Sequence, residues 1–467
     1  MTVRLLLLAA VAALAGCAAG PAYHPPQVEV PIAWKTEPGW QVAKPDDAAV
    51  RGAWWRRFGD AQLDDLEQQA LAASPNLAAA AARLAQARSQ VDVQAAGLFP
   101  QLSAGLRGAR QKISANRPLT NDNSPNFSTV QNDFGLNFSV AYEADLWGRV
   151  RSTVDAARAL AEQSAADFQN VRLVLTTDLA ANYFNLRELD IELEVLAQSI
   201  ALQRRALDLA NARHQLGATS GLDVAQQQAL LDNTLTQVDV LRRQRSQFEN
   251  AIATLIGRPA PLFALRADIV PRKAPDVPVA LPSEVLQRRP DVASAERAMA
   301  AANAQIGIAR AAYYPSIVLN PVLGVDSRKL GALFDVSSLL WSLGVSVTQP
   351  LIDAGRTDAN VAIAQAGYQL AVANYRRTVL TAMQEVQDGI NGSVALDRGL
   401  AQARLAEQSA QRVLQLANDR YEGGAASYLE VITAQQSLLN AQRQAAQLLG
   451  QRLLVSVLLV KAVGGEW

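Results

Sequence analysis

The sequence contains few of the residues that most often carry chemistry. Among its 467 residues there is one cysteine, Cys17, and there are two histidines, His24 and His214, far apart in the chain. A histidine-rich metal site or acid–base site is therefore not indicated. Lysine plus arginine and aspartate plus glutamate both number 43, so the charge favours neither a nucleic acid nor an acidic surface as partner.

The sequence also lacks the short motifs of the common enzyme classes. It has no glycine-rich phosphate loop, no Cys/His spacing typical of a metal site and no nucleophile elbow. Its titratable residues are not concentrated in any one stretch. We therefore predict that the protein is not an enzyme and has no catalytic residue, no metal and no cofactor other than a covalent lipid, discussed next.

The N-terminus reads as a secretory signal. Arg4 precedes an apolar run, residues 5–14, which is too short to span a bilayer. The sequence Leu14-Ala15-Gly16-Cys17 resembles a bacterial lipobox, which predicts a lipid on Cys17. Ala18, in place of an aspartate, favours the outer membrane by resemblance to lipoprotein sorting. The alternative is a plain signal with a chance cysteine.

A sixteen-residue stretch occurs twice, at residues 209–224 and 416–431. An offset of 207 residues pairs glycine, serine and leucine positions: Gly217 with Gly424, Ser220 with Ser427, and Leu222 with Leu429. Each copy predicts a helix that ends at its glycine, which can adopt a left-handed conformation, and a serine that caps the next helix. We expect two helical hairpins with these glycine turns at their tips.

The repeat extends over most of the chain and predicts a tandem duplication. We divide the sequence into residues 1–16 (signal peptide), 17–60 (lipidated extended tether and equatorial region), 61–258 (first repeat), 259–289 (proline-rich linker) and 290–467 (second repeat). In the first repeat we expect a helix, a β-hairpin at about 101–143 and long helices at about 149–215 and 221–257. In the second we expect a helix, a β-hairpin at about 316–350 and long helices at about 356–422 and 427–463.

The long helices show a heptad-like period. Proline is absent between Val150 and Arg213, and apolar residues recur at spacings that sum to seven, as they do in the last helix at Ile432, Leu439, Ala446, Leu453 and Val460. This period predicts coiled coils. The alternative, an ordinary buried helix, does not fit the length, because globular helices average about 11 to 12 residues.

The hairpins alternate with period two. Phe134, Leu136 and Phe138 alternate with small or polar residues, and Trp341 and Val345 do the same in the second half. Transmembrane barrels alternate in this way over strands of about 9 to 11 residues. Four strands cannot close a barrel, and open edges are not tolerated in hydrocarbon, so other copies must complete the sheet. A soluble sheet is the alternative.

The aromatic stretch 54–58 follows a proline-rich segment that carries no apolar period. We expect an extended tether that wraps the surface and is anchored on the helices by these aromatic residues. A ligand-binding box is the alternative reading of the same residues.

This arrangement resembles the outer membrane factor family, the TolC-like channel proteins, and most closely its NodT-type lipoprotein branch. The resemblance covers essentially the whole mature chain. It rests on Leu14-Ala15-Gly16-Cys17, on residues 54–60, 142–149 and 288–291, and on the glycine-rich ending at residues 461–467.

The resemblance implies a mixed, mainly helical fold. Three chains of that family form one twelve-stranded transmembrane β-barrel, four strands from each, and a long periplasmic α-helical barrel of coiled coils. The expected role is a passive exit duct in the outer membrane of a Gram-negative cell, anchored by its lipid. The implied partners are two further copies, a periplasmic adaptor, an inner-membrane pump of the RND type and outer membrane lipids, but no nucleic acid.

The resemblance also assigns site residues. Gly217 and Gly424, with Ser220, Leu222, Ser427 and Leu429 beside them, match the tips that meet the adaptor. Tyr421 and Asp223 match a pair that links the two coiled coils in the closed state, and Glu430 matches a pore-lining acid. Where a known member has an arginine, this chain has Ala426, which departs from the closing network. The plainer reading is that Asp223 and Glu430 stabilise the first turns of their helices.

Other functions remain open from the sequence. An exit duct could serve small-molecule efflux, type I protein secretion or metal export, since selection usually lies in the pump. A non-conducting lipoprotein scaffold across the envelope would have coiled coils, but would not need the alternating hairpins. The cargo, the pump and the adaptor are not indicated by any residue.

Overall fold

The computed structural model describes residues 19–24, 30–35, 52–116, 128–275 and 282–465. The predicted lipidation site, Cys17, lies outside these residues. The chain divides into two compact units. The strand unit comprises residues 1–26, 84–164 and 295–375, and the coiled-coil unit comprises residues 27–83, 165–294 and 376–467. Several helices continue from one unit into the other.

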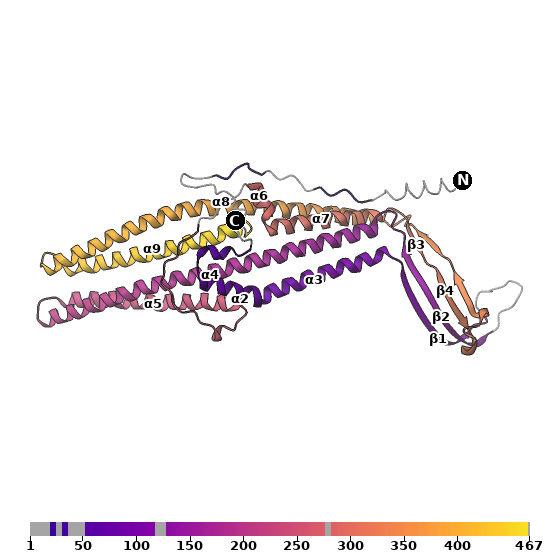
Figure 1. The fold of residues 1–467 in the computed structure, drawn as a ribbon, viewed down its shortest axis with the longest axis horizontal. Helices are drawn as coiled ribbons and strands as arrows, with labels where there is room; N and C mark the ends of the chain where they lie inside the picture. Colours follow the sequence, from indigo (N-terminus) through magenta and orange to yellow (C-terminus); the bar gives the residue numbers. More distant parts are fainter. Residues whose placement is uncertain (1–18, 25–29, 36–51, 117–127, 276–281, 466–467) are drawn as a thin grey trace. The chain divides into compact units, whose positions relative to one another are not determined.

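The long helices come in two pairs of equal length (Figure 1). Helices α4 (Arg149–Gln215) and α8 (Arg356–Glu422) each have 67 residues, and α5 (Gly221–Leu255) and α9 (Tyr428–Ala462) each have 35. The shorter helices are α2 (Ala61–Ala73), α3 (Pro75–Ala95), α6 (Pro282–Arg288) and α7 (Pro290–Ala311). Proline opens α3 and α7, where its missing N–H costs nothing. Helix α6 lies in the linker that we expected to hold little helix.

The strand unit contains six described strand segments. They are β1 (Gln101–Ile113), β2 (Thr129–Glu143), β3 (Ser316–Leu319), β4 (Val322–Ser327), β5 (Leu339–Ser342) and β6 (Val345–Thr348). β2 pairs with β1 on one side and with β3 and β4 in succession on the other, and β6 and β5 pair with β3 and β4. All pairs are antiparallel. The segments therefore form four rows of strand, with β1 at one edge and β5 and β6 at the other.

The second half of the sheet is interrupted where the sequence predicted one continuous hairpin. Pro321 stands between β3 and β4, and a proline has no N–H to donate to a strand ladder. The sheet nevertheless stays joined there, since the Pro321 carbonyl accepts from Val140 N at 3.0 Å and Asn320 N donates to the Gly344 carbonyl at 2.9 Å. The interruption is a local break in two rows that keep their neighbours.

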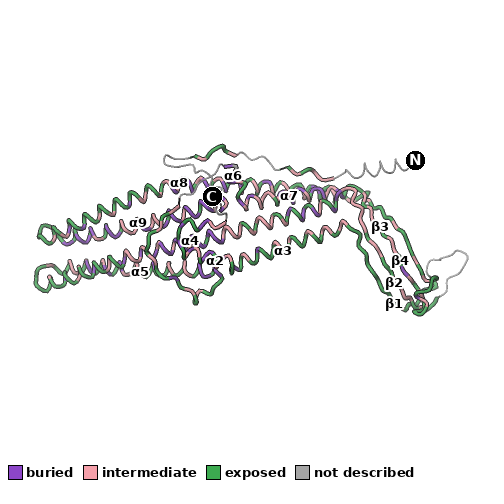
Figure 2. Tube along the Cα trace, viewed as in Figure 1, coloured by how far each residue is buried: buried purple, intermediate pink, exposed green. Residues whose placement is uncertain are grey.

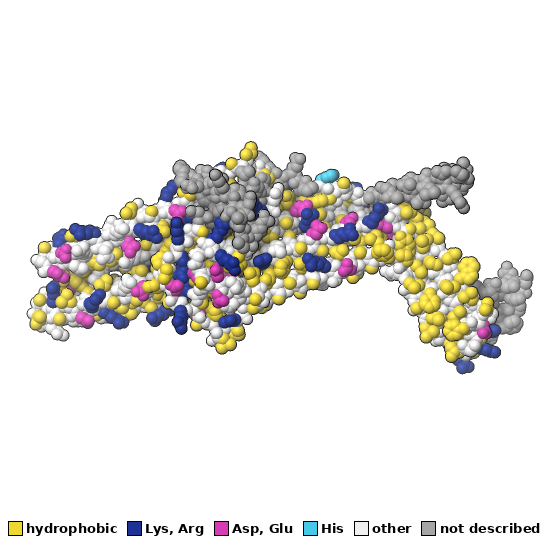
Figure 3. Space-filling model, in the orientation of Figure 1, with side chains coloured by type: hydrophobic (Ala, Val, Ile, Leu, Met, Phe, Trp, Pro, Cys, Tyr) yellow, Lys and Arg dark blue, Asp and Glu magenta, His cyan; other side chains and the backbone are white. Residues whose placement is uncertain are grey.

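One face of the sheet is apolar and lies open. The register aligns Ala104, Phe138, Leu323 and Trp341 across four segments, and Leu106, Leu136, Val325 and Leu339 in the next apolar row. Leu106 is 84% exposed and Trp341 is 69% exposed. Figure 3 shows hydrophobic side chains over the visible side of these strands. The predicted alternation is thus present, and its apolar side is not buried within the chain.

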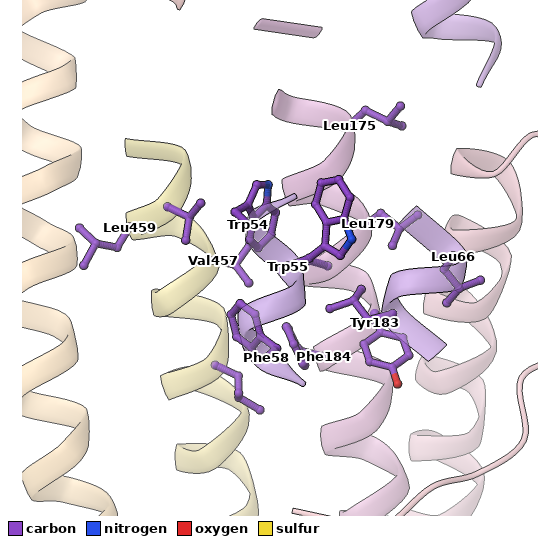
Figure 4. Close-up of a cluster of buried hydrophobic side chains, with 14 of the residues drawn as sticks. Trp54, Trp55, Phe58, Leu66, Leu175, Leu179, Tyr183, Phe184, Val457 and Leu459 are labelled. Carbon is purple, nitrogen blue, oxygen red and sulfur yellow. The ribbon is translucent and has the colours of Figure 1, made fainter. Parts of the chain in front are cut away.

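The coiled-coil unit has its largest core around the aromatic stretch 54–58 (Figure 4). Trp54, Trp55 and Phe58 are buried between α4 and α9, where Phe58 packs on Phe184 with ring centroids 4.8 Å apart. Trp54 Nε1 also donates to the Thr176 hydroxyl at 3.2 Å. These aromatic residues anchor the N-terminal segment on the helices, as predicted, and the ligand-box reading has no support from this packing.

Asp60, directly after these aromatics, holds three elements together. Its carboxylate caps α2 and accepts from the Tyr183 hydroxyl of α4 and from Arg272 Nε of the linker, each at 2.7 Å. Burial alone would raise the pKa of Asp60, but the hydrogen bonds from Tyr183, the Leu63 amide and Arg272 lower it below its ordinary value. Asp60 is therefore ionised at neutral pH and fixes the tether on the core.

The linker is held by a second buried network. Arg187 of α4 and Arg245 of α5 both pair with Asp190, at 2.7 and 2.6 Å, and donate to the carbonyls of Arg266 and Leu265. The Asp190 carboxylate also accepts from the Asp268 amide at 3.1 Å. Arg187 and Asp190 are fully buried, and each has a hydrogen-bonded partner in the linker, whereas Arg187 Nε is buried without a partner in the described part of the chain. The proline-rich segment gains its conformation from the helices.

The heptad prediction for the last helix is confirmed by burial. Each of the five residues Ile432, Leu439, Ala446, Leu453 and Val460 is buried, and Figure 2 shows buried positions recurring along α9. Within the described residues, α9 alone is long and apolar enough to cross a bilayer by composition, and half of that apolar window is buried. We assign it as the core helix of a coiled coil.

Helix α9 approaches α4 closely at a glycine. A Cβ on Gly450 would lie 2.7 Å from Glu188 Cβ. Glu188 is half-buried, and its carboxyl faces Glu192 one turn along α4. Arg443 of α9 pairs with Glu192 at 3.0 Å and donates to Gln237 of α5 at 2.9 Å. Burial first, then the hydrogen bond and charge of Glu192, raises the pKa of Glu188 to about 8, although Arg443 opposes the shift.

Glu188→Gln should flatten the dependence of thermal stability on pH. A carboxyl whose pKa is higher in the folded chain binds more protons there, so stability falls as pH rises from the unfolded pKa of about 4.5 to about 8. The midpoint of thermal unfolding of the wild type should decrease over this window more steeply than that of the variant. Glu422→Gln, at an exposed position of α8, is the control. Equal slopes for wild type and Glu188→Gln would contradict the assignment.

Candidate functional site: the two turns and the contact between the coiled coils

Each helical hairpin of the coiled-coil unit turns at a glycine in the left-handed conformation. Gly217 has φ of 72° and Gly424 has φ of 69°. In the first turn, Ala218 N donates to the Arg213 carbonyl at 2.8 Å, and in the second Ala425 N donates to the Arg420 carbonyl at 2.8 Å. These bonds close the ends of α4 and α8 in one geometry, because a glycine can take positive φ without strain.

The two turns differ in how the following helix begins. Ser220 caps α5 in a capping box, in which its hydroxyl accepts from the Asp223 amide and the Asp223 carboxylate accepts from the Ser220 amide. Ser427 stands at the start of α9, but its side chain makes no capping bond. The expected second serine cap is therefore wrong. The longer side chain at the equivalent acidic position, Glu430, reaches Arg420 of α8 instead, at 3.8 Å.

Apolar side chains stand exposed beside both glycines. Leu222 is 65% exposed and Leu429 is 53% exposed, and Figure 2 shows exposed positions around both turns. A Cβ added at Gly217 or Gly424 would meet no atom within 4 Å. The sequence-predicted tip residues thus form two open turns with exposed leucines, and in the first turn Leu216, 84% exposed, adds to Leu222.

The predicted link between Tyr421 and Asp223 is not formed in the described part of the chain. The Asp223 carboxylate accepts from the Thr219 hydroxyl and serves the capping box, the plainer role considered from the sequence. The Tyr421 ring lies against the Tyr428 ring, with centroids 5.0 Å apart, and under the Arg213 guanidinium, also at 5.0 Å. Arg213 thereby joins α4 to α8 through a cation–π contact. The role of Tyr421 and Asp223 in a closed state stays a prediction.

A different buried hydrogen bond connects the two coiled coils. The Tyr428 hydroxyl at the start of α9 donates to Gln227 Oε1 of α5 at 3.0 Å, and Gln227 Nε2 donates to the Gln203 carbonyl of α4 at 3.0 Å. Both glutamines are fully buried. Burial, followed by the electrostatic influence of Tyr421 and Asp223, raises the pKa of Tyr428 to about 12, so this hydroxyl keeps its proton and can donate. We call Tyr428, Gln227 and Gln203 the tyrosine–glutamine link.

Sequence reasoning missed this link, although one signal was present. Gln203 lies seven residues after Leu196 and seven before Ala210, so it is a polar residue in a core position of the heptad. Polar residues at such positions often fix the register of a coiled coil at a cost in stability. The partner, Tyr428, is 201 residues from Gln227 in the chain, and no local pattern connects the two.

The groove beside the link is lined by amides. A cavity of about 450 Å³ lies among α4, α8 and α9, lined by Gln198, Ser199, Leu202, Gln203, Gln411, Leu414, Gln415, Asn418, Gln435, Leu438, Leu439 and Gln442. The Oε1 atoms of Gln203 and Gln435 are buried without a partner. In the described residues no three His, Cys, Asp or Glu side chains gather where they could hold a metal ion. The cavity therefore presents amide side chains that can form hydrogen bonds, and the surfaces of three helices.

The chain is similar to a known protein family and to several curated proteins. The family model described as "Outer membrane efflux protein" matches residues 66–258 and again residues 281–465. Among curated proteins, the chain is 31% identical to the pyoverdine export outer membrane protein OpmQ of Pseudomonas aeruginosa, over 99% of this chain and 97% of that protein. It is 32% identical to the toluene efflux pump outer membrane protein TtgC of Pseudomonas putida, over 100% of this chain and 96% of that protein.

A solved structure has the same fold. A membrane protein from Pseudomonas aeruginosa superposes with a TM-score of 0.87 at 30% sequence identity, covering 96% of this chain and 100% of that one. The similarity therefore spans the strands, the long helices and both turns.

Proposed function

This chain belongs to the outer membrane efflux protein family, and we propose that three copies of it form an exit duct through which a tripartite pump discharges small molecules. The single observation that carries the proposal is the four-row sheet with one open apolar face and two unpaired edges. In this proposal the duct is passive, and the inner-membrane pump drives transport. Its place is the outer membrane of a Gram-negative cell, as for its relatives.

The sheet supports assembly with further copies of the chain. Among the described strands, β1 pairs only with β2, and the β5–β6 row pairs only with β3 and β4, so each edge leaves a row of backbone N–H and C=O groups without a strand partner there. Inside a bilayer such groups cost several kcal/mol each, and only a closed barrel satisfies them all. Three four-row sheets joined edge to edge give the twelve strands that the resemblance to the family implies, with the apolar face toward lipid.

The coiled coils support the partners. Their two turns present the exposed leucines Leu222 and Leu429 beside Gly217 and Gly424, a surface that suits the apolar side chains of another helical hairpin. We assign this surface, with Ser220 and Ser427, to a periplasmic adaptor that connects the duct to an inner-membrane pump. The relatives are named for pyoverdine export and toluene efflux. For this chain we propose small-molecule cargo, selected by the pump.

The duplicated sequence and the predicted lipid also support a duct in the outer membrane. The double match of one family model supports a duplicated chain whose halves each contribute a hairpin and a coiled coil. A lipid on Cys17 would add a membrane anchor of about 0.8 kcal/mol per buried CH₂ group. Together these features support a lipoprotein duct that is held at the membrane by both its strands and its lipid.

The tyrosine–glutamine link supports a gate. It connects α9 to α5, one helix from each hairpin, with one buried hydrogen bond. Such a bond contributes only about 1 kcal/mol net, enough to bias the turns yet weak enough for a docking adaptor to overcome. We propose that this link, with Tyr421 and Asp223 beside it, restrains the turns until the adaptor docks, and that Glu430 lines the opening.

Leu106→Arg should prevent assembly in the membrane. Leu106 stands on the apolar face of β1, and an arginine facing lipid near the midplane of a barrel costs about 2–4 kcal/mol. We expect a strong loss of heat-resistant oligomer from the outer membrane fraction on a denaturing gel. Ser103→Arg, on the opposite face of the same strand, is the matched control and should assemble. A similar loss in both variants would mean that this face does not meet lipid.

Single-channel conductance in a planar bilayer tests the duct and its gate together. The wild type should conduct weakly, and Tyr428→Phe should conduct more, because Gln227 Oε1 then loses its buried partner at a cost of about 1–3 kcal/mol. Thr433→Ala removes a hydroxyl that bonds only within α9, to the Leu429 carbonyl, and should behave as wild type.

The same recordings separate the alternatives. If the double variant Tyr421→Phe, Asp223→Ala opens the channel while Tyr428→Phe does not, the gate lies at the pair predicted from the sequence. If inserted oligomers of all variants fail to conduct, the duct is refuted and the chain is a non-conducting scaffold.

A further inference from the structure

The described residues nearest the N-terminus lie packed on helix α7 in the strand unit. Ala19 N donates to the Trp147 carbonyl at 3.1 Å, and Asn303 Nδ2 of α7 donates to the Pro21 carbonyl at 3.0 Å. The Tyr23 hydroxyl donates to the Glu296 carboxylate, also of α7, at 2.6 Å. We call residues 19–23 the strap. The strap thus contacts α7 at Glu296 and Asn303, and, as described next, at Gly307.

The strap touches the helix backbone directly at a pair of glycines. A Cβ on Gly20 would lie 3.0 Å from the Gly307 Cα, and a Cβ on Gly307 would lie 3.1 Å from the Gly20 Cα and 2.8 Å from the Ser152 hydroxyl of α4. Neither glycine needs positive φ, so backbone conformation does not explain them. The close approach of the two chains does, because any side chain at Gly307 would push the strap away.

The far end of the strap is fixed by Tyr23. Burial, and then the hydrogen bond to Glu296, raises the pKa of the Tyr23 hydroxyl, which therefore remains a donor. A hydrogen bond to a charged acceptor is stronger than one between neutral groups. The strap is thus attached at both ends and in contact at its centre.

The near end of the strap meets the junction of sheet and helices. Trp147 lies between β2 and α4, stacks on Tyr314 with centroids 4.8 Å apart, and donates from Nε1 to the Pro315 carbonyl at 2.8 Å, directly before β3. Trp and Tyr side chains are the residues that membrane proteins place at the lipid–water interface. Cys17 stands two residues before Ala19, and two residues of chain extend at most about 7 Å, so a lipid on Cys17 would be attached within that distance of Ala19.

We propose that the α7 surface around Gly307 is a docking site for the strap of the same chain, and that this docking directs the chain's own strands into the membrane by holding its lipid at the Trp147 junction. The proposal rests on the proposed function, since it assumes a lipid on Cys17 and strands that insert. A lipid on a free tether would keep the chain near the membrane in any orientation. A docked strap gives the sheet a high effective concentration at the interface.

Gly307→Ala tests the docking against a matched control. Its added methyl group would meet the strap, whereas Gly367→Ala, at an exposed helical glycine of α8 in the same unit, meets no atom within 4 Å. Lipid labelling of Cys17 should be unchanged in both. Heat-resistant oligomer in the outer membrane should fall about tenfold in Gly307→Ala, equivalent to about 1.4 kcal/mol of lost docking, and stay at the wild-type level in Gly367→Ala.

A second background separates docking from folding. In a chain exported by an ordinary signal peptide with Cys17→Ser, there is no lipid to position, so Gly307→Ala should lower assembly no further. An equal additional loss in both backgrounds would mean that Gly307 serves only the packing of the chain, and would overturn the proposal.

The contact itself is tested by a disulfide between Gly20→Cys and Ser152→Cys. A Cβ on Gly20 would lie 3.8 Å from the Ser152 hydroxyl oxygen, so the side chains of cysteines at these two positions would be in contact. Oxidised membranes should yield a crosslink within one chain. A crosslink between chains, or none, would refute docking on the same chain. Oligomers of Gly307→Ala that do insert should conduct as wild type, so failure of this proposal leaves the duct untouched.

Discussion

The structure depends on the hydrogen-bonding requirement of the backbone groups at the edges of its sheet. A sheet of four strand rows has β2 and the β3–β4 row inside and β1 and the β5–β6 row outside, so it carries two edges whose hydrogen-bonding groups have no strand partner among the described residues. Water could satisfy those groups, but the exposed apolar face, with Leu106 and Trp341, favours hydrocarbon, where they need strands from other copies. The need for further copies follows from this requirement, and the resemblance to the family sets the proposed number at three.

The packing of the helices depends on their length. Helices of 67 and 35 residues cannot be buried in a globular core, so they pack as coiled coils whose heptad rows face each other. The same packing buries polar side chains such as Gln227, whose amide oxygen then needs a specific partner. Tyr428 supplies it. The tyrosine–glutamine link places polar groups in the core of the coiled coils, which lowers their stability. It is also a contact at which the two hairpins can separate.

Local patterns in the sequence predicted what is locally determined. Glycines at positions 217 and 424 mark the helix ends, the prolines at positions 75 and 290 open helices, and the seven-residue rows of α9 are buried. Long-range partners were not predictable in this way. The contact of Tyr428 with Gln227, the linker held by Arg187 and Arg245, and the strap on α7 each depend on residues far apart in the chain. The missing cap at Ser427 shows that a repeated motif can keep its backbone turn while its side chains change partners.

Native mass spectrometry of the protein extracted from outer membranes in mild detergent tests the central claim most directly. The account requires that the edges of the sheet are closed by two further copies, so it predicts the mass of three processed and acylated chains. A complex of one or two chains, from membranes in which the protein is functional, would contradict the twelve-stranded barrel, because four or eight of these rows would then have to close without the third copy.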